Sequence, residues 1–401
     1  MTDLEALPHP GAGGIAAQPS FRLLCSVLAC GAAARPGLPA LLSDPGTARS
    51  LRACAAAEGV SAALHEAVAA HFVRDVPRPD RIVLATQHAA NARRNRAILD
   101  AVGEIAGAAA ARAVDVVALK GAAWIVADSA AHAAWREMVD VDLLVDPRHY
   151  DAMPQVLERL GYGPASDADR FRVNFHHRPY RRAGMPFTVE IHRHLGWRHE
   201  LLDPAALIGE ARRIGPGLLL PAPWCRAFHA IVHWQVQDFG LQRGTLPVRA
   251  LLDIARFLCD GRVDWARIMA HARAVGAVPA CEAAVAAAAT LLGAPVPAAV
   301  TIGAAGRRHV ARSLARHDSP ARTWLATQTW RAGTLWRCEK VAYRLALDGR
   351  GPLARRGLLA LHRAVRLPYL AVRIVGIVAR GGLLWLRVAG TRRRRVATPP
   401  P

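Results

Sequence analysis

The sequence predicts an α+β fold in which a small sheet lies between two helical regions. Three runs in the middle of the chain have the apolar and β-branched content of strands, at residues 113–119, 139–145 and 187–194. Residues 51–110 before them, and the chain after Pro204, have the residue spacing of helices. With 401 residues and 52% hydrophobic content, the chain is long enough to bury a substantial core in two or three packed units.

Five segments are expected in order along the chain. The first carries acids, Gly, Ala and Pro in place of a basic stretch ahead of an apolar one, which predicts a flexible leader and not a signal peptide. The second is alanine-rich and helical, with a break at Pro77 and Pro79. In the third, residues 149–160 should form a helix that stops at Gly161. The segments are a leader (1–20), a helical N-terminal segment (21–110), a core with the strands (111–200), a helical domain (201–300) and a basic helical tail (301–401).

Two aspartates alternate with apolar residues along the second predicted strand. Because side chains two apart on a strand point to the same face, Val139, Val141 and Leu143 are expected in the core, with Asp140 and Asp142 together in solvent. Carboxylates that close repel each other unless a cation lies between them. Hard oxygen ligands suit Mg²⁺, which keeps some waters and accepts phosphate oxygens. The alternative is an exposed strand end with two solvated acids.

A phosphate-binding turn is predicted directly after the first strand. Lys120 and Gly121 open an apolar helix, and free amides at a helix N-terminus can hold phosphate oxygens. Lysine occurs only at Lys120 and Lys340, while arginine supplies the other 50 of the 52 basic side chains. A compact ammonium group beside a glycine turn suits a phosphate, although one chance codon would explain it equally well.

The third strand carries an acid that could complete a three-carboxylate site. Residues 181–184 read as a hairpin turn, which places Glu190 on a strand that can neighbour the aspartate pair. His192 and His194 share its face, so a zinc site is an alternative, because imidazole prefers zinc where carboxylate prefers magnesium. The spacing matches no fixed zinc motif. Further histidines nearby are His176, His177 and His199.

The order of these motifs resembles the uncharacterised bacterial nucleotidyltransferase-like family of the DNA polymerase beta superfamily. The likeness covers about residues 60 to 295, with specific motifs in the middle and looser ones at the flanks. The specific motifs are Leu119-Lys120-Gly121, Arg136 ahead of Asp140–Val145, Gly161-Tyr162 and Val189–His192. The looser ones are Asn91, Arg93, Arg94 and Asn95 before the core, and Leu220-Pro221, His229, His233, Arg249–Asp253 and Asp264-Trp265 after it.

The resemblance implies a minimal nucleotidyltransferase mixed sheet and a metal-dependent reaction. A nucleoside monophosphate would pass from a nucleoside triphosphate such as ATP to a hydroxyl acceptor, with release of pyrophosphate. Arg136 could instead fix the strand or pair with an acid. The implied site consists of Asp140, Asp142 and Glu190 as catalytic carboxylates and ligands of Mg²⁺ or Mn²⁺, Lys120, Gly121 and Arg136 at the nucleotide, and His192 and His233 lining the cleft.

One departure from the family pattern favours a second reading. Other members of the superfamily place Gly-Ser at the turn after the first strand, where the serine helps to hold the phosphates; here Gly121 is followed by Ala122. The alternative is therefore a catalytically inactive protein of the same fold that binds a nucleotide or a partner. The basic tail would tether such a protein to a membrane.

The net charge of +21 is concentrated at one end of the chain. Residues 301–401 hold 21 of the 52 Lys and Arg side chains and 3 of the 31 Asp and Glu, which leaves 31 basic and 28 acidic side chains in residues 1–300. A nucleic-acid enzyme is expected to carry a basic groove beside its site, so a small molecule or peptide is the favoured acceptor. Seven cysteines without a Cys-x-x-Cys pair favour a reducing cytoplasm.

The basic tail has a seven-residue repeat of arginine. Arg366, Arg373, Arg380 and Arg387 would form one slowly drifting stripe on a helix that is otherwise apolar. Residues 363–395 could therefore lie on an anionic membrane surface, at the inner membrane face. They are a poor spanning segment because each arginine at mid-bilayer costs about 2.5–3.5 kcal/mol. The alternative is a helix packed on its own domain with the stripe in water.

Overall fold

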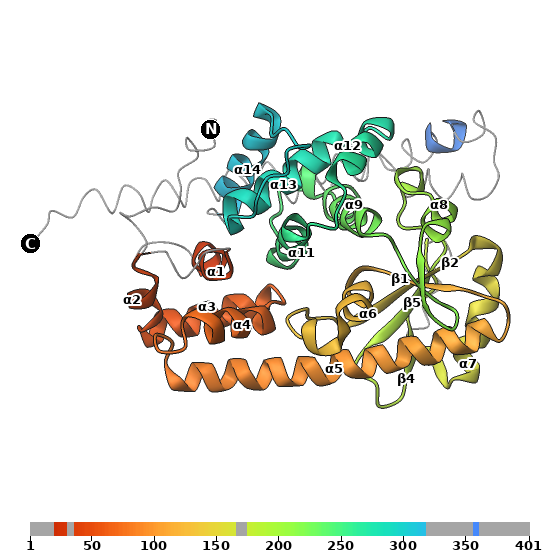
Figure 1. The fold of residues 1–401 in the computed structure, drawn as a ribbon, viewed down its shortest axis with the longest axis horizontal. Helices are drawn as coiled ribbons and strands as arrows, with labels where there is room; N and C mark the ends of the chain where they lie inside the picture. The colour runs from red at the N-terminus through yellow and green to blue at the C-terminus, as the bar shows by residue number, and fades with distance from the viewer. Residues whose placement is uncertain (1–19, 30–35, 166–174, 318–355, 361–401) are drawn as a thin grey trace, which may run out of the picture. The chain divides into compact units, whose positions relative to one another are not determined.

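A computed structural model describes residues 20–29, 36–165, 175–317 and 356–360 of the chain. The chain divides into two compact units, one of residues 1–238 with 246–310 and the other of residues 239–245 with 311–401. The first unit contains the sheet and most of the described helices (Figure 1).

The first unit begins with five helices. Asp44 caps the third by accepting a hydrogen bond from the Thr47 amide. The predicted break at Pro77 and Pro79 is confirmed, because α4 has ended by His71 and α5 starts just after Pro77. The five are α1 (Ser20–Leu28), α2 (Leu38–Leu42), α3 (Pro45–Ala57), α4 (Ser61–His71) and the 33-residue α5 (Arg78–Ala110).

Seven short strands form one mixed sheet, in the order β3-β4-β5-β2-β1-β7-β6. Strand β1 pairs antiparallel with β2 and parallel with β7, and β2 pairs parallel with β5. A mixed sheet among many helices agrees with the predicted α+β class. The strands are β1 (Val116–Ala118), β2 (Asp140–Val145), β3 (Tyr162–Pro164), β4 (Tyr180–Arg182), β5 (Thr188–His192), β6 (Arg212–Gly215) and β7 (Leu218–Leu220).

Two details of the predicted strands are wrong. Val139 was expected in the core, but it precedes β2 and its side chain is 63% exposed. Residues after Pro204 were expected to be helical, yet β6 and β7 extend the sheet there as an antiparallel pair. Strand β7 is held at the sheet by its parallel pairing with β1, about a hundred residues earlier in the chain.

The turns between the central strands follow the sequence signals. The region predicted as one helix over 149–160 is a 3-10 helix (Pro147–Ala152) that continues into α7 (Met153–Arg159). Gly161 ends it with a φ of 79°. The hairpin turn before β5 is confirmed, because Gly184 has a φ of 78° and β4 pairs antiparallel with β5. The chain from 166 to 174 lies outside the described residues.

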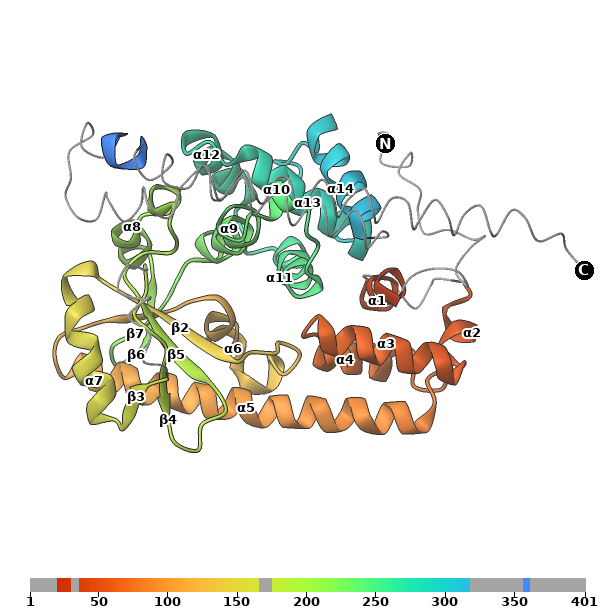
Figure 2. The same cartoon turned by 180° about the vertical axis from the view of Figure 1, so that it is seen from behind.

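The main core lies between the sheet and three helices. Buried side chains of α5, of α7 and of α6 (Lys120–His132) pack against β1, β2 and β5. Figures 1 and 2 both show α5 running along one face of the sheet. Helix α9, which follows β7, contacts α6, α11, α12 and α13. The later elements of this unit are a 3-10 helix (His199–Leu201), α8 (Pro204–Gly209), α9 (Pro223–Val232), a π-helix (His233–Gln237), α11 (Val248–Cys259), α12 (Trp265–Ala274) and α13 (Val278–Leu292).

In the second unit the structure describes α10 (Gly240–Arg243) and the last turns of α14 (Ala304–His317). The Arg316 guanidinium donates a hydrogen bond of 2.7 Å to the Arg243 carbonyl. The predicted leader and the arginine stripe of 363–395 fall outside the described residues, apart from Ser20 at the start of α1. None of the described helices combines the length and the apolar character that crossing a bilayer requires.

Candidate functional site

Strands β2 and β5 place three of the predicted acids close together. Because the two strands are parallel and Asp142 is in register with Glu190, these side chains lie side by side. Asp140 is one alternate position earlier on β2 and faces the same way. Contrary to the expectation of two solvated acids, Asp142 is 3% exposed, and Asp140 and Glu190 are half-buried.

Lys120 is the immediate counter-ion of Asp142. Its Nζ donates to Asp142 Oδ1 at 2.9 Å. The Leu119 amide also donates to the Asp142 carbonyl, at 3.0 Å, which fixes the end of β1 against β2. Lys120 itself adopts the left-handed conformation, with a φ of 44°, a conformation that is uncommon outside glycine and marks functional turns.

Gly121 is required at the start of α6 by a close approach. A Cβ at this position would lie 2.0 Å from Met138 Sδ, so any side chain would force the buried Met138 side chain to move. The sequence placed the unusual backbone turn at Gly121, whereas the structure has it one residue earlier. Glycine here lets the N-terminus of α6 pack close to the aspartate strand.

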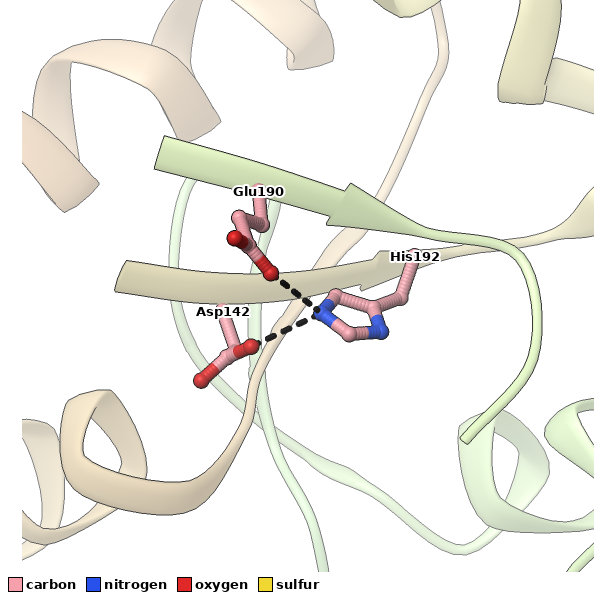
Figure 3. Close-up of side chains that lie close together, drawn as sticks. All are labelled: Asp142, Glu190 and His192. Atoms are coloured by element: carbon pink, nitrogen blue, oxygen red, sulfur yellow. Dashed lines mark hydrogen bonds and ion pairs between the residues drawn. The ribbon is translucent and has the colours of Figure 1, made fainter. Parts of the chain in front are cut away.

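His192 contacts both acids from the far end of β5 (Figure 3). Its Nε2 lies 2.8 Å from Asp142 Oδ1 and 3.9 Å from Glu190 Oε2. Its Nδ1 is buried and has no hydrogen-bond partner among the described residues. His176 Nδ1 lies 3.7 Å from Glu190 Oε2 on the other side. Among the described residues, Asp142, Glu190 and His192 are the one set of His, Cys, Asp or Glu whose ligand atoms all lie within 4.8 Å of one another.

His194 does not join that set, although the sequence placed it on the same face as His192. Strand β5 ends at His192, and the His194 ring lies 5.2 Å from the ring of His199 instead. The zinc alternative built on neighbouring histidines is therefore replaced by a mixed set with one imidazole and two carboxylates.

The charges of this cluster act on one another strongly. Burial alone would raise the pKa of Asp142, but the charge of Lys120 and the hydrogen bond from His192 hold that pKa well below its usual value. Burial, and then the negative charge of Asp142, raise the pKa of Glu190 to about 7. The same two causes raise the pKa of Asp140. Asp142 is therefore ionised, whereas neither Asp140 nor Glu190 forms a salt bridge with a Lys or Arg side chain among the described residues.

A cavity of about 190 Å³ opens on one side of the aspartate strand. Asp140 and Asp142 line it from β2, and Lys120 lines it from the start of α6. The opposite wall is formed by Arg226, His229 and His233, on α9 and the π-helix that follows it. Their spacing of three and then four residues places them on one helix face, called the α9 stripe below. Glu190 and His192 are not among the residues that line the cavity, so His192 lies behind Asp142. From the sequence, His192 was expected to line the cleft.

The α9 stripe carries neutral imidazoles. Burial, followed by the charge of Lys120, lowers the pKa of His229 to about 3, and the same causes lower the pKa of His233 well below its ordinary value. His229 donates to the Leu195 carbonyl, and its Nε2 is buried with no partner among the described residues. Arg226 was missed in the sequence, although its spacing of three residues before His229 could have revealed it.

Arg136 lines the cavity but is held by an acid. Its guanidinium donates to both carboxylate oxygens of Asp253 on α11, each at 2.9 Å, and to the Glu137 carbonyl at 2.8 Å. Its own carbonyl accepts from Asn91 and Asn95 of α5. The alternative in which Arg136 pairs with an acid is confirmed, and three of its five N–H donors are directed at protein oxygens.

Comparison with known families agrees with the geometry of the site. The model of a family described as "Uncharacterised nucleotidyltransferase" matches residues 45–293, which contain the sheet, the acids and both walls of the cavity. No curated protein matches the chain. No solved structure matches it either.

Proposed function

The chain belongs to the uncharacterised nucleotidyltransferase family, and on that basis we propose that it transfers a nucleoside monophosphate from a nucleoside triphosphate to a hydroxyl acceptor and releases pyrophosphate. The observation that carries the proposal is the meeting of Asp140, Asp142 and Glu190 on adjoining parallel strands, at the edge of a cavity. Carboxylates in that arrangement suit a divalent ion and a bound triphosphate.

The residues fit Mg²⁺ or Mn²⁺. Asp140 and Asp142 line the cavity. Burial, followed by the negative charge of Asp142, raises the pKa values of Asp140 and Glu190, and a bound cation would favour their ionised forms. A divalent ion bound by these oxygens would neutralise charge on the triphosphate and hold the α-phosphorus in line for attack. Glu190 would ligate the ion or accept the proton of the attacking hydroxyl.

Lys120 and Gly121 would hold the phosphates. The ammonium group of Lys120 now lies against Asp142, and it lines the same cavity, so a short movement would bring it to a phosphate. The amides at the N-terminus of α6 are placed for the same purpose. Arg136 would support the site through Asp253 and Asn91 without contacting the nucleotide.

The acceptor would enter along the α9 wall. His233 lines the cavity, and His229 offers a buried ring nitrogen without a partner among the described residues. A hydroxyl group could donate a hydrogen bond to that nitrogen. The near balance of charge in residues 1–300 favours a small molecule or a peptide over nucleic acid, in the cytoplasm.

A second candidate is an inactive protein of the same fold that binds a nucleotide or a partner. Two observations favour it: Ala122 stands where a serine would hold the phosphates, and Lys120 is bound to the aspartate that a metal would need. Residues 363–395 would tether either form to an anionic membrane surface.

Binding of each of the four nucleoside triphosphates, with and without Mg²⁺ or Mn²⁺, tests the proposal. Wild-type protein should bind at least one of them in a metal-dependent way, and Asp140→Asn should lose that dependence. Asp146→Asn is the matched control, because Asp146 directly follows the same strand and, among the described residues, its carboxylate accepts hydrogen bonds only from Arg148. Metal-dependent binding without pyrophosphate release, whatever hydroxyl compound is added, supports the inactive alternative. No binding at all contradicts the proposal.

A further inference from the structure

We propose that Asp142, Glu190 and His192 form a separate metal site, in which the His192 imidazole is a ligand and which selects a first-row transition-metal dication over Mg²⁺. This inference rests on the proposed function in one respect, because Asp142 and Glu190 are also used by the site that faces the cavity. It adds a nitrogen ligand, and therefore a metal preference, that three carboxylates alone would not give.

The ligand atoms are already close to the required positions. Zn²⁺ and similar ions bind imidazole nitrogen and carboxylate oxygen at about 2.0–2.2 Å, so ligand atoms around one such ion lie roughly 3–3.5 Å apart. His192 Nε2 is 2.8 Å from the nearer oxygen of Asp142 and 3.9 Å from that of Glu190. Shifts of about half an ångström would open room for an ion at the centre of the three.

The backbone holds the three residues in place. Asp142 and Glu190 are paired in register on β2 and β5, and His192 is the next residue on the same face of β5. The His192 and Asp142 side chains are 2% and 4% exposed, whereas that of Glu190 is 19% exposed. Two ligands are therefore fixed by burial, and the third lies where an ion can enter from solvent.

Asp142 can serve two ions because its two oxygens point in different directions. Figure 3 shows one oxygen directed at His192, which is also the oxygen that Lys120 contacts, and the other turned away. The cavity is lined by Asp140 and Asp142, and neither Glu190 nor His192 is among its lining residues. The site on the cavity side has oxygen ligands alone and room for a phosphate, while the site behind Asp142 has an imidazole and is nearly closed.

The imidazole decides which ion the closed site prefers. Magnesium favours oxygen ligands and gives up its waters reluctantly, whereas nitrogen ligands raise the affinity for transition ions from Mn²⁺ towards Zn²⁺. Nε2 must carry its lone pair to bind an ion. Since Nδ1 has no hydrogen-bond partner among the described residues, the ring proton can move to Nδ1 without breaking another bond.

Pulsed electron paramagnetic resonance of Mn²⁺ bound to the metal-free, full-length protein tests the inference directly, because it detects a nitrogen bonded to the ion. Wild-type protein should show the coupling of one imidazole nitrogen. His192→Gln should lose it, and the preference for Mn²⁺ over Mg²⁺ in a competition titration should fall about tenfold or more. Two variants should keep the coupling: Asp140→Asn, which alters only the cavity side, and His176→Gln, which removes the neighbouring ring 5.0 Å from His192.

The outcomes separate this inference from the proposed function. Bound Mn²⁺ without nitrogen coupling in the wild-type protein overturns the inference and leaves the site on the cavity side intact. Coupling that disappears in His176→Gln and persists in His192→Gln also overturns it, because the nitrogen ligand is then a different one. Nitrogen coupling with no metal-dependent nucleotide binding supports the closed site and contradicts the nucleotidyltransferase proposal. Failure of Mn²⁺ to bind at all overturns both.

Discussion

Arg136–Asp253 and Lys120–Asp142 are both ion pairs with a buried acid, and all four residues line the same cavity. The first is closed: two parallel hydrogen bonds of 2.9 Å join the guanidinium to both carboxylate oxygens, and both side chains are about 10% exposed. The second is open: Lys120 makes one contact, its side chain is 24% exposed, and Asp142 shares the contacted oxygen with His192.

The difference shows which pair holds the fold and which can take part in binding. A guanidinium that donates three hydrogen bonds to protein oxygens joins elements that are far apart in sequence, here α11 and the segment before β2, and is held in place by them. A lysine with a single contact can leave it. Asp140 and Glu190 lie next to the open pair, and burial followed by the charge of Asp142 raises their pKa values, so a cation bound there would stabilise their ionised forms.

Breaking the closed pair should have the largest effect on stability. Arg136→Met leaves the buried Asp253 carboxylate without its partner, which should lower the free energy of unfolding by about 3–5 kcal/mol in urea titrations. The double variant Arg136→Met/Asp253→Leu should recover most of that loss, because two apolar side chains leave no unpaired charge. A loss below about 1 kcal/mol in Arg136→Met would show that this pair does not stabilise the packing of α11 against the segment before β2.

Breaking the open pair at its acid should reduce activity and leave the fold intact. Asp142→Asn removes a negative charge that serves both the site facing the cavity and the site with His192. Turnover should therefore fall about 10²–10³-fold, which corresponds to about 2.7–4 kcal/mol of activation free energy. Its melting temperature should stay near that of wild type, because asparagine keeps an oxygen that accepts from Lys120 and His192. Nearly wild-type turnover in this variant would remove Asp142 from the catalytic machinery.

Local patterns in the sequence predicted the elements of the open pair. Alternation along 139–145 and 187–194 located the two strands, and a lysine ahead of a glycine located the start of α6. The proximity of Glu190 to the aspartates followed from the hairpin turn that precedes it. Each of these signals lies within a few residues, so a single sequence is enough to read it.

Contacts between distant parts of the chain could not be predicted from these local patterns. The Arg136–Asp253 ion pair joins residues that are 117 positions apart, and the sequence of neither segment indicates which residue its partner is. Strands β6 and β7 have only four and three residues, and they exist because β7 pairs with β1. The alternation of apolar residues also did not reveal that Val139 lies just before the start of β2, where its side chain is exposed.

The surplus charge beside the open pair should appear as a pH dependence of stability in the metal-free protein. Burial, and then Asp142, raise the pKa of Glu190 from 4.5 to about 7, so the folded protein keeps a proton that the unfolded chain has already released. The contribution of this proton to the free energy of unfolding is therefore fully present below pH 4.5 and is lost as the pH rises through 7. At about 1.4 kcal/mol per pKa unit, the loss is at most about 3.5 kcal/mol.

Urea unfolding at pH 5 and pH 8 with a chelator measures this loss. Glu190→Gln has no proton to lose, so it should gain stability over wild type at pH 8 compared with pH 5. Glu158→Gln, on the exposed face of α7, should show no such difference. An equal difference between Glu190→Gln and wild type at both pH values would contradict the raised pKa. Added Mn²⁺ should restore the stability of wild type at pH 8 and leave Glu190→Gln little changed.

Removing the base of the open pair should have the smallest effect, in contrast with Arg136→Met. In Lys120→Met the Asp142 carboxylate keeps its contact with His192, and the partly exposed position of residue 120 admits water, so the melting temperature should fall less than in Arg136→Met. Binding of the triphosphate should weaken about tenfold, or about 1.4 kcal/mol, because one point charge at the phosphates is lost. Isothermal titration of wild type, Lys120→Met and Lys120→Arg measures it. If Lys120→Met unfolds the protein as Arg136→Met does, both pairs are structural clamps, and the cavity has no free cation for a phosphate among the four residues compared.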